Sequence, residues 1–378
     1  MKSEETTKGI SINAVGDILL ADAYLDIGYG IGSQIKKKGD FFPFEKITGY
    51  FENRDVLIGN LECPLSSTTP NRGLRSKEFL ASPVVVGGLK RIGFDALLVA
   101  NNHMLQHGPE AYKETIEYLK NAGMQPVGRV LKTEAPQSLA KIVCKDMTLG
   151  FLGYSMTKNT NNSPANEFAH HANKEDILEG IHSNRKECDY LILMLHWGEE
   201  FVARPSKVQV ELAHQFIDEG ADVIIGSHPH VLQGVESYRG KTIAYSLGNF
   251  VFNMPAPMCR KTAILSVKVG LDDTQESNLQ PVWINQYGQP EIPSGKVLSD
   301  IDKTIKIISK ELSKEYQGDD EYRRIIETGL STHRKWVKRA FIENINRVEK
   351  QLILQMIYEY ILRRIDECLK KKAVRIIS

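Results

Sequence analysis

Short apolar runs recur through the first 270 residues, and five of them end in a small residue followed by a polar side chain. Segments with helix-start signals or helical periodicity lie between these runs. Strands that alternate with helices form parallel sheets, and the carboxyl ends of parallel strands meet at one edge. The pattern therefore predicts an α/β fold with polar side chains gathered at the edge of a sheet.

The side chains that follow these runs are carboxylates, amides and imidazoles. They are Asp17, Asn60 with Glu62, Asn102 with His103, His196, and His228 with His230. Any one of them has an ordinary structural explanation, such as an aspartate that caps a turn. Carboxylate, amide oxygen and imidazole together suit Zn, Mn or Fe, and no thiolate is implicated. The recurrence predicts a site for one or two divalent metal ions.

The stretch from Gly226 to His230 places two imidazoles two residues apart, directly after the apolar run 221–225. Pro229 biases His228 toward extended geometry, and residues i and i+2 of an extended segment point to the same side. We therefore expect His228 and His230 to face one side together, as half of a metal site.

Apolar runs and helix-start signals predict further strands and helices. Strands are predicted at 10–20, 94–100, 190–195, 242–250 and 262–269, and helices at 82–91, 110–122, 174–184 and 206–219. Residues 271–300 are rich in Gly and Pro, which predicts loops.

From residue 301 the chain is mildly basic and has helical periodicity. One apolar stripe consists of Val337, Phe341, Ile345, Val348 and Leu352, and it continues into 356–361. Such a stripe is explained by packing onto the body of the same chain or by self-association, which would make a homo-oligomer. Both explanations stay open at this point.

Composition excludes some classes of partner. A net charge of +1 over 378 residues argues against nucleic acid. No run of about 18 apolar residues exists, so no membrane span is expected. The N-terminal residues 1–8 are polar and predict no signal peptide, and five cysteines without a CxxC pair favour free thiols. These features predict a cytoplasmic protein.

Six segments of the chain resemble, in order, the motifs of the CapA family of poly-γ-glutamate capsule biosynthesis proteins, which are related in fold to the calcineurin-like metallophosphoesterases. The segments are Gly16-Asp17, 59–62, 100–103, 196–198, 226–230 and 245–250. The resemblance implies a four-layer α/β/β/α sandwich over residues 10–270. A connecting segment, 271–300, and a helical C-terminal extension, 301–378, would follow.

The resemblance also implies roles for individual residues. The metal ligands would be Asp17, Glu62, Asn102, His196, His228 and His230. His103, beside Asn102 in the catalytic motif, would protonate a leaving oxygen, a role suited to an ordinary histidine pKa of roughly 6.5. Asn60 and Asn249 would line the substrate site.

Two positions depart from the patterns of these families. The phosphoesterases usually carry Asp-x-His in the first motif, whereas Ile18 and Leu19 follow Asp17 here, so one metal would lose an imidazole. Capsule relatives often have an aspartate three residues after the motif histidine, where this chain has Gln106. That change puts an outer hydrogen bond to His103 in question.

The function implied by the resemblance is metal-dependent hydrolysis of a phosphoester or related anionic substrate, small molecule or polymer, in capsule or poly-γ-glutamate biosynthesis. The alternative is a non-catalytic, metal-stabilised accessory protein that helps to assemble or export an anionic polymer. Family members usually work at the membrane or cell surface, which disagrees with the cytoplasmic location that the sequence predicts.

Overall fold

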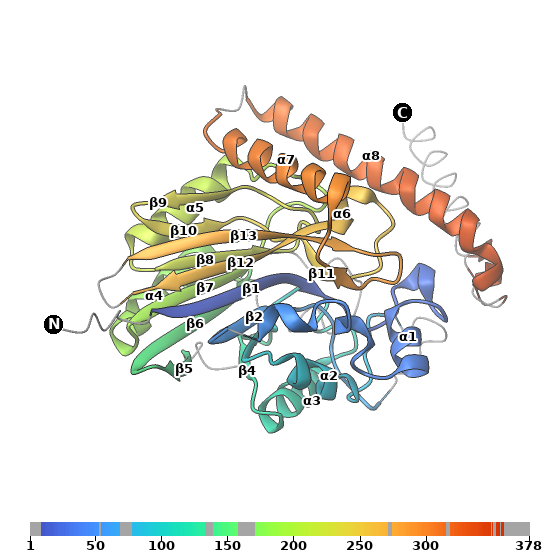
Figure 1. The fold of residues 1–378 in the computed structure, drawn as a ribbon, viewed down its shortest axis with the longest axis horizontal. Helices are drawn as coiled ribbons and strands as arrows, with labels where there is room; N and C mark the ends of the chain where they lie inside the picture. Colours follow the sequence, from blue (N-terminus) through green and yellow to red (C-terminus); the bar gives the residue numbers. More distant parts are fainter. Residues whose placement is uncertain are drawn as a thin grey trace, which may run out of the picture.

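Two β-sheets packed face to face form the centre of the protein, and helices cover both outer faces (Figure 1). The computed structural model describes residues 9–52, 54–68, 78–132, 139–157, 171–270, 274–314, 318–348, 350, 353–355 and 357–358. The layers confirm the α/β/β/α sandwich with a C-terminal helical extension.

The first sheet has the strand order β14-β13-β12-β1-β2-β3-β4, and β11 pairs with β1. Its strands are β1 (Ile10–Ile18), β2 (Val56–Leu61), β3 (Ala96–Leu98), β4 (Gln125–Val127), β11 (Asn249–Val251), β12 (Lys261–Val269), β13 (Gln275–Ile284) and β14 (Pro290–Glu291). Strands β1 to β4 are parallel. Helices α1 (Ile31–Lys38), α2 (Val85–Ile92) and α3 (Pro109–Asn121) pack on the outer face through one apolar cluster.

The second sheet has the order β5-β6-β7-β8-β10-β9. Its strands are β5 (Ala140–Cys144), β6 (Met147–Ser155), β7 (Tyr190–His196), β8 (Val223–Ser227), β9 (Val235–Tyr238) and β10 (Lys241–Ala244). Helices α4 (Lys174–Asn184) and α5 (Lys207–Asp218) cover it, and each begins with a capping box. Strands β6, β7, β8 and β10 are parallel, so their carboxyl ends meet at one edge.

The core between the sheets comes from side chains that alternate along the strands. Ile12 and Ala14 of β1 pack with Phe151, Ile192 and Ile225 of the second sheet in one buried cluster. This cluster holds the two sheets together and places the ends of both sets of parallel strands close to each other.

Residues 242–250, predicted as one strand, belong to two different sheets. The chain leaves the second sheet after β10, turns at Gly248 with φ +72°, and joins the first sheet as β11. This crossing sets Asn249 in register with Asp17. The hydrophobic pattern carried no sign of it, because both halves are buried.

The expectation of a loop-rich segment at 271–300 was wrong. Strand β13 extends the first sheet by pairing with β12, and Pro281 lies within it. The helix predicted from Ser82 begins only at Val85. Strand β1 ends at Ile18, two residues before the predicted limit.

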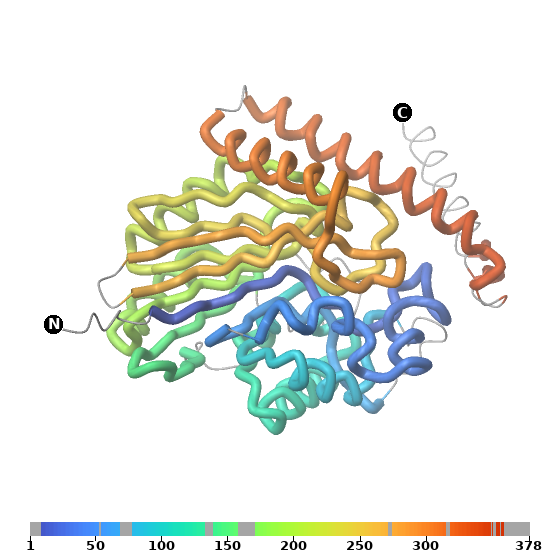
Figure 2. The backbone as a smooth tube through the Cα atoms, viewed as in Figure 1, coloured from blue at the N-terminus to red at the C-terminus, as the bar shows by residue number. Residues whose placement is uncertain are grey.

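The C-terminal helices α7 (Gly295–Glu311) and α8 (Asp319–Asn344) pack on the body of the chain, and α8 runs past the short helix α6 (Pro257–Arg260) toward the segment around α1 (Figure 2). Leu330 and Trp336 of α8 pack against Phe201 and Cys259. The structure thus favours packing onto the chain itself over self-association for this part of the extension.

The predicted apolar stripe is interrupted at the end of α8. Val348 is buried beside Ile27, whereas Ile345 is 40% exposed. Leu352, Met356, Tyr360 and Ile361 lie outside the described residues. Among the helices that the structure describes, none combines the length and apolar character needed to cross a bilayer.

Candidate metal centre

Asp17 lies fully buried near the end of β1, between Asn60 of β2 and Asn249 of β11. Asn60 donates a hydrogen bond from Nδ2 to Asp17 Oδ1 at 2.8 Å. A Cβ at the preceding residue, Gly16, would overlap the carbonyl oxygen of Gly248. Glycine at this position therefore lets β11 approach and brings Asn249 to the aspartate.

Glu62 follows β2 and is completely buried, yet neither of its carboxylate oxygens has a hydrogen-bond partner in the part of the chain that the structure describes. Its Oε1 lies 3.6 Å from His230 Nε2 and 3.9 Å from His103 Nε2. Burial and then the negative charge of Asp17 raise the pKa of Glu62 well above its ordinary value. A buried carboxylate without partners is unfavourable, and a cation would compensate it.

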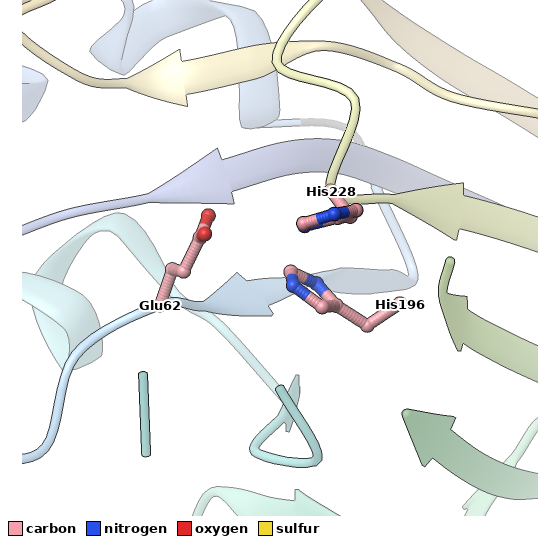
Figure 3. Close-up of side chains that lie close together, drawn as sticks. All are labelled: Glu62, His196 and His228. Carbon is pink, nitrogen blue, oxygen red and sulfur yellow. The ribbon is translucent and has the colours of Figure 1, made fainter. Parts of the chain in front are cut away.

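His196 at the end of β7 and His228 after β8 complete one side of the site. Figure 3 shows the carboxylate of Glu62 facing the rings of these two histidines. Burial lowers the pKa of both imidazoles well below the ordinary value, and neighbouring histidines lower it further. Both are thus neutral, which is the form that binds metals, and no described residue forms a hydrogen bond with His228 Nδ1.

Both ring nitrogens of His196 have polar neighbours, so its tautomer decides which nitrogen can act as a ligand. Its Nδ1 lies 3.1 Å from Ser227 Oγ, and its Nε2 lies 2.9 Å from Asn102 Oδ1. The tautomer that donates from Nδ1 to Ser227 leaves the Nε2 lone pair beside the amide oxygen. A cation between these two acceptor atoms would be held by both.

Two groups of potential ligands share Glu62: Glu62 with His196 and His228, and Glu62 with Asp17 and His230. In each group the ligand atoms lie within 4.8 Å of one another. The structure thus brings the predicted metal-binding side chains together. They come from both sheets, β1 and β2 of the first and β7 and β8 of the second, and not from one sheet edge as the strand pattern indicated.

The extended backbone predicted for His228 and His230 was wrong. Strand β8 ends at Ser227, and His228 and His230 have φ of +97° and +57°, a conformation that residues other than glycine rarely adopt. Both side chains still face the site, with ring centroids 6.1 Å apart, but they join different groups of potential ligands. Burial lowers the pKa of His230, but Glu62 and Asp17 outweigh it and raise the value to about 10.

In the first motif Leu19 stands where the phosphoesterases usually carry a histidine, and the structure shows the consequence. Leu19 is buried in the core and offers no ligand. The group around Asp17 has one imidazole, that of His230, whereas the group around His196 has two. The two groups thus differ in ligand chemistry.

His103 lies beside the site, but its pKa is not ordinary. Burial lowers the pKa to about 4, against the opposing effect of a hydrogen bond to Gln106. Gln106 Oε1 lies 2.8 Å from His103 Nδ1, so the amide oxygen can accept a hydrogen bond from the ring at the position where the sequence departs from the family pattern. With Nδ1 bonded in this way, Nε2 is directed toward Glu62.

Several residues near the site were not assigned from sequence. Asn101 donates from Nδ2 to Asn60 Oδ1 at 3.1 Å, and its own Oδ1 accepts from the backbone N–H of His103. Its place inside the motif 100–103 was an available signal. Asn249 Oδ1 lies 2.9 Å from His230 Nδ1, so this residue orients a histidine as well as flanking Asp17.

Three phenylalanines pack on the histidines of the site. Phe79 stacks on His103 with ring centroids 4.0 Å apart, and Phe252 meets His230 edge-on at 5.0 Å. Phe201 lies over His230 at 6.0 Å. Phe79 and Phe201 have φ of +54° and +64°, and no local sequence signal marks either position.

The fold and the site define an α/β/β/α sandwich protein with buried, metal-capable side chains where its two sheets meet. The profile of the family described as bacterial capsule synthesis protein PGA_cap matches residues 11–254. The chain therefore belongs to this family, which confirms the resemblance seen in the motifs.

Two curated relatives support the assignment. The capsule biosynthesis protein CapA of Bacillus anthracis is 30% identical over 335 residues, which cover 83% of this chain and 76% of that protein. The PGA biosynthesis protein CapA of Bacillus subtilis (strain 168) is 28% identical over 284 residues, covering 73% of this chain and 72% of that protein.

Solved structures with a similar arrangement are more distant. A putative 5'-nucleotidase from Staphylococcus aureus in complex with alpha-ketoglutarate aligns with a TM-score of 0.46 at 13% identity, over 79% of this chain and 58% of that one. The 5'-nucleotidase precursor from Thermus thermophilus has a TM-score of 0.44 at 12% identity, over 80% of this chain and 59% of that one. The chain thus spans less than two thirds of either solved chain.

Proposed function

We propose that the chain is a metal-dependent hydrolase that acts on a phosphoester or related anionic substrate in capsule or poly-γ-glutamate biosynthesis. The observation that carries the proposal is Glu62, a fully buried carboxylate that is common to two groups of potential ligands and has no hydrogen-bond partner among the described residues. Membership of the capsule synthesis family and the names of the Bacillus relatives support the biological context.

The donor set fits a divalent cation such as Mn, Zn or Fe, because it combines carboxylates with imidazoles and an amide oxygen. The residues that would hold one or two ions are Asp17, Glu62, Asn102, His196, His228 and His230. A divalent ion bound there would lower the pKa of water and polarise the substrate oxyanion. Asn60 and Asn249 orient Asp17 and His230 through the hydrogen bonds described above.

His103 is suited to a proton transfer at the leaving oxygen. Gln106 holds the tautomer with hydrogen on Nδ1, so Nε2 is the atom that exchanges a proton with substrate. A bound anion raises the pKa of a nearby imidazole, which favours protonated Nε2. As the oxygen of water bonds to phosphorus and the bond to the leaving oxygen breaks, the Nε2 proton passes to that oxygen.

The test uses the full chain with Mn, Zn or Fe, measured for metal content and for hydrolysis of a generic aryl phosphate. We expect bound metal and hydrolysis in the wild type, and loss of kcat by about 10²–10⁴-fold for His103→Gln with unchanged metal content. Wild-type protein that binds metal but hydrolyses no phosphoester under any metal condition would refute the hydrolase.

The burial of the ligands favours a second candidate, a metal-stabilised accessory protein without catalysis. His228 is 6% exposed and Asp17 and Glu62 are 0% exposed, so any bound ion would be enclosed. This candidate predicts that metal raises the melting temperature while no substrate is turned over. The assay above separates the two functions, because only the hydrolase predicts product.

A further inference from the structure

Two aspartates lie close together between β1 and α1, outside the candidate metal centre. Asp26, in the 3-10 helix η1 (Tyr24–Asp26), is 6% exposed, and Asp22 is 9% exposed. In the described part of the chain, no basic side chain forms an ion pair with either aspartate. Burial and then the negative charge of Asp22 raise the pKa of Asp26 well above its ordinary value. Two buried carboxylates side by side are unfavourable unless a cation or a proton compensates them.

Both oxygens of the Asp22 carboxylate accept hydrogen bonds from the loop that leads into α1. Oδ1 accepts from the backbone N–H of Ser33 at 2.8 Å. Oδ2 accepts from the N–H of Gly28 at 2.9 Å and from the hydroxyl of Ser33 at 2.5 Å. The carboxylate is therefore held in place by the segment that surrounds it.

The Asp26 carboxylate is only half satisfied. Asn253 donates from Nδ2 to Asp26 Oδ2 at 2.7 Å. Asp26 Oδ1 is buried and has no hydrogen-bond partner among the residues that the structure describes. This is the same condition that marks Glu62 in the candidate metal centre, and it points to a missing positively charged partner.

Gly30 leaves an open space beside the two carboxylates. A Cβ on this glycine would overlap Asp26 Oδ1 and would lie 2.8 Å from Asp22 Oδ1. The two Oδ1 atoms thus border one small space. The φ of Gly30 is −69°, which any residue can adopt, so glycine is needed here for room and not for its conformation.

The donor atoms around this space are all oxygens, with neither an imidazole nor a thiolate among them. Such a set suits a hard cation. Mg²⁺ demands near-ideal octahedral geometry, whereas Ca²⁺ accepts irregular sets of about six to eight oxygens. Asp22 and Asp26 are fixed by their hydrogen bonds, so Ca²⁺ is the better match. Asp26 and Asn253 also line a cavity of about 710 Å³, from which water can complete the coordination.

We propose that Asp22 and Asp26 bind a Ca²⁺ ion in the space beside Gly30, as a structural site separate from the candidate metal centre. The two sites share no residue and differ in donor chemistry. The inference goes beyond the proposed hydrolase and does not depend on it.

The ion would hold together segments that cover the candidate metal centre. Phe79 donates from its backbone N–H to the carbonyl oxygen of Asp22 at 2.9 Å. Asn253, which donates to Asp26, directly follows Phe252. The rings of Phe79 and Phe252 pack on two histidines at that centre. Ca²⁺ would thus stabilise the placement of both phenylalanines.

The test titrates Ca²⁺ and Mg²⁺ into the full chain by calorimetry, after a chelator has removed other divalent ions. Glu62→Gln is titrated beside the wild type, because it disables the candidate metal centre. We expect both proteins to bind one Ca²⁺ ion, at least about tenfold more tightly than Mg²⁺. Asp26→Asn keeps the shape of the side chain and should weaken Ca²⁺ binding by about tenfold or more. Asp300→Asn, which removes a carboxylate paired with Lys261, should bind as the wild type does.

A second variant tests the location. Gly30→Ala would fill the space beside the aspartates and should also abolish the binding of Ca²⁺. Gly49→Ala is the matched control, because its Cβ would have only Glu52 Oε1 within 4 Å, at 3.8 Å. Melting temperatures in chelator identify the variants that are folded.

Hydrogen exchange gives a readout that does not depend on the affinity measurement. The amides of Gly28 and Ser33 donate to Asp22, so Ca²⁺ should slow their exchange in the wild type and not in Asp26→Asn.

Wild-type protein that binds no Ca²⁺ would overturn the site, and the two aspartates would then share a proton. Undiminished binding in folded Asp26→Asn or Gly30→Ala would overturn the location, and tighter binding of Mg²⁺ would overturn the choice of ion. Failure of the hydrolase has a different signature, since phosphoester hydrolysis would be absent while Ca²⁺ binding that requires Asp26 persists.

Discussion

Phe201 stacks face to face on His333 of α8, with ring centroids 3.7 Å apart and an angle of 7° between the rings. The same phenylalanine lies over His230 at 6.0 Å. A single ring thus connects the C-terminal helix to the candidate metal centre. We infer that changes in the packing of α8 reach the site, although α8 lies outside the segment that matches the family profile.

Glu62→Gln should abolish tight binding of Mn, Zn or Fe, because both ligand groups contain this carboxylate. Metal at one hundred times its Kd should stabilise the wild type by about 2.7 kcal/mol, and chelation should reverse this. The measurements are elemental analysis and thermal unfolding with and without metal. Glu200→Gln, a nearby carboxylate outside both groups, is the control. A metal-dependent rise in melting temperature that survives in Glu62→Gln would show that the ion binds elsewhere.

Gln106→Ala should lower kcat by roughly 10–100-fold with little change in metal content, because Gln106 orients His103, which is not one of the candidate ligands. Gln106→Glu keeps an acceptor at the same place and should recover most of the activity. Steady-state kinetics across pH measures both variants. If Gln106→Ala retained wild-type kcat, the orienting role of this residue would be wrong.

Gly329→Ala should loosen α8, because a Cβ at this position would overlap the backbone carbonyl of Phe201. Overpacking of this kind destabilises by about 1–3 kcal/mol. Thermal unfolding and limited proteolysis of the C-terminal segment measure the effect. Ser331→Ala, at an exposed position of the same helix, should cause neither change. Equal stability of the two variants would contradict the close contact between α8 and Phe201.

His333 should make the protein less stable in acid. Burial, with a smaller contribution from His230, lowers its pKa in the folded protein to about 4. The unfolded chain has the ordinary value of roughly 6.5. Between these values the unfolded state binds the additional proton, so the free energy of unfolding falls as the pH falls through this window.

His333→Phe keeps the stacking on Phe201 and removes the titration, so its melting temperature should depend less on pH over the same window. The comparison is made between the two proteins at each pH, because other buried histidines also titrate. Parallel curves for wild type and variant would mean that His333 does not contribute to acid sensitivity.

Much of the secondary structure could be predicted from local patterns in the sequence. Strands β7 and β12 and helices α3, α4 and α5 lie within two residues of their predicted limits, because their apolar periodicity and caps are local properties. The six candidate ligands were among the eight polar residues at the ends of apolar runs, and the resemblance to the family singled them out. Where the chain is buried on all sides, as at 242–250, the pattern did not distinguish one strand from two in different sheets.

The sequence by itself determined the layered α/β class, the family and the identity of the candidate ligands, because these depend on residue type and order. Only the tertiary structure decided how the candidate ligands divide into two groups. Left-handed backbone at His228 and His230 separates two neighbours in sequence into different groups. Packing of the two sheets brings Glu62 between them, and burial sets the pKa of His103 to about 4. These properties depend on distances across the fold, which no local pattern contains.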